Sequence, residues 1–134
     1  MATWWHADVV DNGIAYIKNN CDAIALIDAY SAGDSYATVV GNSVCSVVVD
    51  SSDFTLADNS SFAGSRKISV GAQSGTASAD SVATPALHFA YLDTGNSKVL
   101  AVSDETSDQV ITNGNPVSFP ALDPLFTTKQ PVVP

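Results

Sequence analysis

Charged residues are scarce in this chain of 134 residues, and positively charged ones are the scarcest. Asp, Glu, Lys and Arg make up 14% of the sequence, against about 25% in an average soluble domain. Five Lys and Arg stand against 14 Asp and Glu, which gives a formal net charge of −9 at pH 7. So few scattered cations cannot neutralise a run of phosphates. Nucleic acid is therefore a poor partner, and the same sign argument excludes an anionic membrane.

The chain also lacks a long apolar run. No stretch approaches the length that spans a membrane, and Met1 to His6 do not show the basic and then apolar regions of a secretion signal. We therefore expect synthesis in a reducing cytoplasm. There the two cysteines, Cys21 and Cys45, are expected to be buried and free, although in a secreted chain they could form a disulfide.

Familiar catalytic motifs are missing as well. The two histidines, His6 and His88, lie far apart in the sequence, and His88 sits among apolar neighbours as packed side chains do. There is no Cys-x-x-Cys, His-Glu-x-x-His, Gly-x-Ser-x-Gly or phosphate-binding glycine loop. We expect no enzyme activity, no catalytic residue and no cofactor.

Several carboxylates fall in predicted loops, where oxygen ligands could hold calcium. None matches the ligand spacing of a twelve-residue calcium loop, and Asp side chains in turns commonly bond their own backbone. No metal site is therefore predicted. The residues concerned are Asp50, Asp53, Asp58, Asp104, Glu105 and Asp108.

What the chain does contain is a series of short apolar runs separated by turn residues. Residues 86–92 and 98–102 flank the link Asp93-Thr-Gly-Asn-Ser97, which predicts a β-hairpin. Gly95 and Asn96 are the residues best able to take the positive φ that such a turn needs.

Further strand-like runs bring the count to eight or nine, with residues 71–81 forming a loop or a weak edge strand. This pattern predicts a mainly β protein: one domain over 1–134, folded as an antiparallel two-sheet sandwich or a jelly roll. The further strands are expected at residues 22–28, 36–40, 44–50, 54–56, 66–70, 109–111 and 117–119.

One helix is expected, over residues 3–20. Val10, Ile14 and Ile17 recur at helical spacing, while Gly13 weakens the pattern by about 1 kcal/mol relative to alanine. Trp4 and Trp5 precede this stripe. They either cover the core or anchor a neighbouring subunit, since tryptophan is enriched at tight interfaces.

The C-terminal segment, residues 122–134, contains three prolines and is expected to be extended rather than part of a sheet or helix. Its apolar residues should lie on a surface of this chain or of a partner. These residues are Leu125, Phe126, Val132 and Val133.

Six segments together resemble a family of small structural proteins of tailed bacteriophages. The shared pattern is a histidine, an apolar run, an Asp-containing turn, a leucine–x–valine strand and a strand that ends in proline; the loop 30–40 departs from it. The segments are Asp11–Asn20, Ser52–Asp58, Gly64–Gln73, His88–Asp93, Lys98–Val102 and Asn115–Pro120.

The resemblance implies a virion component on the capsid surface, a decoration or cement protein that ties major capsid protein subunits together. A homo-oligomer, either a dimer or a trimer, is expected. The predicted interface comprises Trp4, Trp5, Leu125, Phe126, Val132 and Val133.

Two alternatives remain. The first is a tail or baseplate module that binds host-surface glycans, with Trp4, Trp5, Tyr30 and Tyr36 as stacking platforms. The second is a small cell-wall hydrolase, which would require carboxylates that converge in a cleft.

Overall fold

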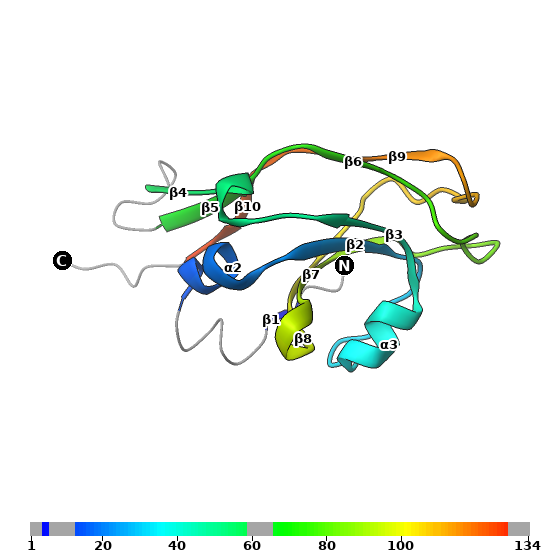
Figure 1. The fold of residues 1–134 in the computed structure, drawn as a ribbon, viewed down its shortest axis with the longest axis horizontal. Coiled ribbons are helices and arrows are strands. Elements are labelled where there is room, and N and C mark those ends of the chain that lie inside the picture. The colour runs from blue at the N-terminus through cyan, green and yellow to red at the C-terminus, as the bar shows by residue number, and fades with distance from the viewer. Residues whose placement is uncertain (1–3, 6–12, 59–65, 129–134) are drawn as a thin grey trace.

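A computed structural model describes the backbone of residues 4–5, 13–58 and 66–128 (Figure 1). The protein is mainly β, with antiparallel sheets and few helices, as the sequence predicts. The strands are β1 Trp4–Trp5, β2 Ala23–Ile27, β3 Ser43–Val48, β4 Phe54–Asp58, β5 Arg66–Val70, β6 Gln73–Thr76, β7 His88–Asp93, β8 Lys98–Asp104, β9 Pro116–Phe119 and β10 Leu122–Thr127. The helices are α2 Ala15–Asn20 and α3 Tyr36–Gly41, with short 3-10 turns at Ser51–Asp53 and Thr94–Asn96.

A five-stranded antiparallel sheet in the order β1-β8-β7-β2-β3 forms the centre of the fold. Its β7–β8 hairpin confirms the predicted one, because Asp93 pairs with Lys98 across the link. The positive φ of the turn does not occur at Gly95 or Asn96, where it was expected. Ser97 takes the positive φ, at 53°, and Asp93 accepts a hydrogen bond from the Asn96 N–H, which fixes the turn locally.

The two smaller sheets, β10-β5-β4 and β6-β9, lie over one face of the large sheet (Figure 1). They are joined twice, since β5 leads into β6 and β9 leads into β10. Leu26 and Phe89 of the large sheet belong to the same buried cluster as Phe54, Ile68 and Val117 of the small sheets. The main core therefore lies between these two layers.

The opposite face of the large sheet has a second, smaller core. It is built from small residues such as Ala25 and Ala90, with Val39 of α3 packed into it. Tyr30 and Tyr36 are partly buried against this cluster.

The helix α3 corrects the strand predicted at residues 36–40. Its β-branched residues favour a strand, but Ser35 caps the helix: its Oγ accepts a hydrogen bond from the Thr38 N–H. Capping stabilises a helix by about 1 kcal/mol, and Val39 is fully buried on the sheet. Local capping and packing together outweigh strand propensity here.

The N-terminal helix predicted over 3–20 is not confirmed, because among the described residues of this range only Ala15–Asn20 is helical. Trp4 and Trp5 pair with Val102 and Ala101 as β1, and the helix begins only at Ala15. Residues 6–12 lie outside the described part of the chain.

The predicted non-sheet character of the C-terminal segment is wrong for its first half. Leu122–Thr127 forms β10, which pairs with β5. Pro124 falls where the register is interrupted, between Leu122 and Phe126, so its missing N–H costs the ladder nothing.

The strand predicted at 109–111 does not form as a regular strand, although Ser81 exchanges two hydrogen bonds with Ile111. No helix among the described residues is long and apolar enough to cross a membrane.

Candidate binding cleft

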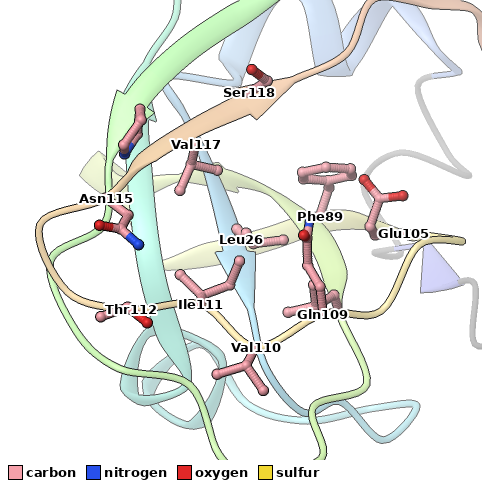
Figure 2. Close-up of a pocket in the computed structure, with 12 residues that line it drawn as sticks. Leu26, Phe89, Glu105, Gln109, Val110, Ile111, Thr112, Asn115, Val117 and Ser118 are labelled. Atoms are coloured by element: carbon pink, nitrogen blue, oxygen red, sulfur yellow. The ribbon is translucent and has the colours of Figure 1, made fainter.

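A cleft of about 300 Å³ opens between the large sheet and the segment that connects β8 to β9 (Figure 2). Residues from three separate parts of the chain meet in it. They are Leu26, Leu87, Phe89, Glu105, Gln109, Val110, Ile111, Thr112, Asn115, Pro116, Val117 and Ser118.

The inner part of the cleft is apolar. Leu26 and Phe89 project from adjacent strands of the large sheet, where β2 and β7 place them directly opposite each other. Val117 and Ile111 point into the same space from the other side (Figure 2). All four side chains are buried, so the cleft is an open extension of the main core.

The outer wall of the cleft, residues 105–113, is held in place by the neighbouring segment 80–87. The Asp80 carboxylate accepts a hydrogen bond from the Asn113 N–H at 2.7 Å, and the Asp108 carboxylate accepts one from the Leu87 N–H at 2.9 Å. Ser81 donates its N–H to the Ile111 carbonyl and accepts the Ile111 N–H on its Oγ, both at 2.9 Å. The wall is thus fixed without a regular sheet.

The mouth of the cleft is polar and carries one charge. Glu105, the only glutamate in the chain, is the only charged residue among those that line the cleft. Its Oε1 accepts a hydrogen bond from the Ser107 N–H at 3.1 Å. Gln109 and Asn115 add amide groups. Val110, which also lines the cleft, is 60% exposed.

The strand β9 runs along the border of the cleft (Figure 2) and, within the described chain, has β6 as its only strand neighbour. Ala77 donates its N–H to the Asn115 carbonyl, which makes residues 77 and 115 a hydrogen-bonded pair. In an antiparallel ladder such pairs alternate with non-bonded ones, so Val117 bonds Gly75 while Ser118 does not bond Ser74. The Ser118 N–H and C=O therefore point away from β6. Pro116 also occupies a non-bonded position, where its lack of an N–H costs nothing.

The two ends of the molecule differ in charge. At the α3 end, defined as residues 28–42, 77–87 and 104–118, there are six carboxylates and no Lys or Arg. All the Lys and Arg within the described residues lie at the α2 end, defined as α2, β4, β5, β10 and the residues that contact them. These are Lys18, Arg66 and Lys67 on these elements, and Lys98, whose Nζ lies 3.5 Å from the hydroxyl of Tyr16 in α2.

The remaining groups capable of chemistry are buried away from the cleft mouth. Both cysteines are free and buried, as predicted. Burial raises the pKa of the Cys21 thiol to about 12 and also raises that of Cys45. His88 is buried on the opposite face of the sheet, where its Nδ1 donates to the Ala86 carbonyl at 3.0 Å and its Nε2 lies 3.5 Å from Asp104. Among the described residues, no three His, Cys, Asp or Glu side chains are grouped to hold a metal ion.

The structure describes only part of the predicted interface: Leu125, Phe126 and the backbones of Trp4 and Trp5. The backbones of Trp4 and Trp5 lie at the β1 edge of the large sheet. Phe126 is buried in the main core against Tyr91, with ring centroids 6.0 Å apart, and Leu125 is half-buried against the same core. Val132 and Val133 lie outside the described residues. The interface itself stays a prediction, but the Phe126 side chain is committed to this chain's own core.

Sequence reasoning did not find the cleft. Its inner residues come from positions 26, 89, 111 and 117, and only the pairing of β2 with β7 and of β6 with β9 brings them together. The unique glutamate beside a segment rich in polar residues was the one available signal. Comparison of the chain with protein-family models, with curated proteins and with solved structures found no match.

Proposed function

We propose that this chain is a structural protein of a tailed bacteriophage particle, a decoration or cement protein that ties adjacent major capsid protein subunits together. The resemblance of its sequence segments to small phage structural proteins supports this role. So does a small antiparallel β body of two packed layers, which we take to be a β-sandwich of the jelly-roll kind. We place the protein on the capsid surface as a dimer or trimer.

The observation that carries the proposal is the difference between the two ends of the molecule. The α3 end is acidic and has an open cleft and a strand edge, whereas the α2 end holds the described cations. Two dissimilar surfaces allow each copy of the protein to contact two neighbouring subunits at different sites. Charge complementarity at such contacts selects partners and orients their approach.

The test is to mix the purified protein with capsid shells of the parent phage that lack it. We expect saturable binding to expanded shells and a rise in the temperature at which the shells break open. Light scattering of the free protein gives its oligomeric state. Absence of binding to expanded shells contradicts the proposal, and binding to isolated tails or to a glycan array instead would favour the tail-module alternative.

A further inference from the structure

We propose that the cleft at the α3 end binds an extended polypeptide segment that adds as a strand to the free edge of β9 and carries a lysine or arginine to Glu105. The inference concerns the chemistry of this cleft and holds whether or not the partner is a capsid protein.

The backbone of β9 supplies the first part of the argument. The Ser118 N–H and C=O point away from β6, and so does the Pro116 C=O. An exposed strand edge of this kind offers main-chain hydrogen bonds to an incoming strand. Pockets beside the edge bind every second side chain of that strand and give specificity. The cleft lies on that side of β9, and Val117 points into it (Figure 2).

The size of the cleft also favours a peptide segment as the ligand. A volume of about 300 Å³ is at the lower limit for a small-molecule site. The space accommodates one or two side chains rather than a large cofactor. Its inner surface of Leu26, Phe89 and Ile111 suits an apolar side chain. The exposed Val110, which lines the cleft, extends that apolar surface outward, as expected of a protein contact.

The negative charge of the cleft favours a cationic residue in this segment. Glu105 is the one charged group in the cleft, and the α3 end has no Lys or Arg of its own to pair with it. An incoming cationic side chain would complete the pair at the rim, whereas an anionic segment would be repelled by Glu105 and by the net negative charge of the α3 end. The geometry therefore selects an extended segment with an apolar residue near a lysine or arginine.

The probe is a set of blocked seven-residue peptides of alternating valine and threonine, with a single lysine moved through the seven positions. Binding is followed by amide NMR of the full chain. At least one peptide should shift the Ser118 and Ile111 amides in a saturable way and slow hydrogen exchange at Ser118. A peptide with glutamate in place of lysine should bind more weakly.

Two variants separate the edge from the charge. Ser118→Pro removes the outward N–H without touching the β6 ladder, and should weaken binding by up to about tenfold, since one main-chain hydrogen bond to the peptide is lost. Ser74→Pro, at the matched non-bonded position of β6, is the control and should leave binding unchanged. Glu105→Gln should weaken binding of the lysine peptides by up to about fivefold, as is typical of exposed ion pairs.

The inference is overturned if no peptide shifts the Ser118 amide at millimolar concentration, or if Ser118→Pro, shown to be folded by its spectrum, binds as well as the parent protein. It is also overturned if free lysine amide alone reproduces the shifts, which would indicate a small-amine site. Failure of capsid binding with retained peptide binding would reject the proposed function and leave this inference standing.

Discussion

Gly75 of β6 lies directly against Cys45 of β3: a Cβ placed on the glycine would stand 3.0 Å from the cysteine Sγ. The same Cβ would come within 2.9 Å of Val47 Cγ1. Both β3 side chains are buried, so neither can move aside freely. The two layers of the fold approach here as closely as they can, because this position has no side chain.

Gly75→Ala should therefore destabilise the protein by about 1–3 kcal/mol, the usual cost of overpacking a core. Urea unfolding followed by tryptophan fluorescence measures the change. Gly41→Ala is the matched control, because a Cβ there meets nothing within 4 Å and the backbone is not left-handed. It should be neutral or stabilising by up to about 1 kcal/mol. Equal effects of the two substitutions would contradict the close approach.

Both thiols should be unreactive in the folded protein. Burial raises the pKa of Cys21 to about 12 from an ordinary 9.0 and raises that of Cys45, so neither forms the reactive thiolate near neutral pH. A thiol reagent such as Ellman's should detect no cysteine in native buffer and both after unfolding in urea. Rapid stoichiometric labelling of the native protein would show that the cysteines are accessible.

Phe126→Ala should destabilise the folded chain by about 3 kcal/mol, because it opens a cavity beside Tyr91 in the main core. Thermal unfolding of the purified variant measures this without any partner present. Leu125→Ala is the neighbouring control and should cost less, since Leu125 is only half-buried. If Phe126→Ala left stability unchanged and affected only assembly, Phe126 would be an interface residue after all.

Asp123 should contribute stability that depends on pH. Its carboxylate accepts hydrogen bonds from Lys67 Nζ at 2.7 Å and Ser69 Oγ at 2.8 Å, and these bonds, with the lysine charge, hold its pKa below the ordinary 3.8. A lowered folded-state pKa means that the stabilisation is present above pH 3.8 and is lost as the pH falls through the folded-state value.

Asp123→Asn should therefore lower the unfolding temperature at neutral pH, and the difference from the parent protein should vanish in strong acid. Melting curves from neutral pH down to about pH 2 test this. Lys67→Gln is the companion variant, and its destabilisation should fade over the same acidic range. A difference that persists unchanged in acid would show that the carboxylate charge is not involved.

The strands were predictable where burial and turn chemistry agree. The β7–β8 hairpin was readable because residues buried on both faces flank a link rich in Asp, Gly and Asn. The helix α3 was not, because its Tyr-Ala-Thr-Val-Val run carries strand propensity, and the Ser35 cap and the burial of Val39 decide in favour of a helix. The strand β10 was missed because Pro124 argues against a strand in the sequence. In the structure the pairing register is interrupted at this proline, so the strand can include it.

The cleft could not be predicted for a different reason. Nothing local in Leu26 or Phe89 distinguishes a residue that lines an opening from one sealed in the core. That difference arises where the 105–113 wall stops short of closing over the sheet, and its position depends on hydrogen bonds to residues 80–87.

The gathering of the described cations beside α2 makes this molecule an electric dipole as well as an anion. In the field of a charged surface it would rotate before contact, so that one end arrives first in most encounters. The effect reaches only about 10 Å at 0.1 M salt. Raising the ionic strength should therefore lower the association rate and leave the dissociation rate nearly unchanged, and measuring both rates at several salt concentrations would test this.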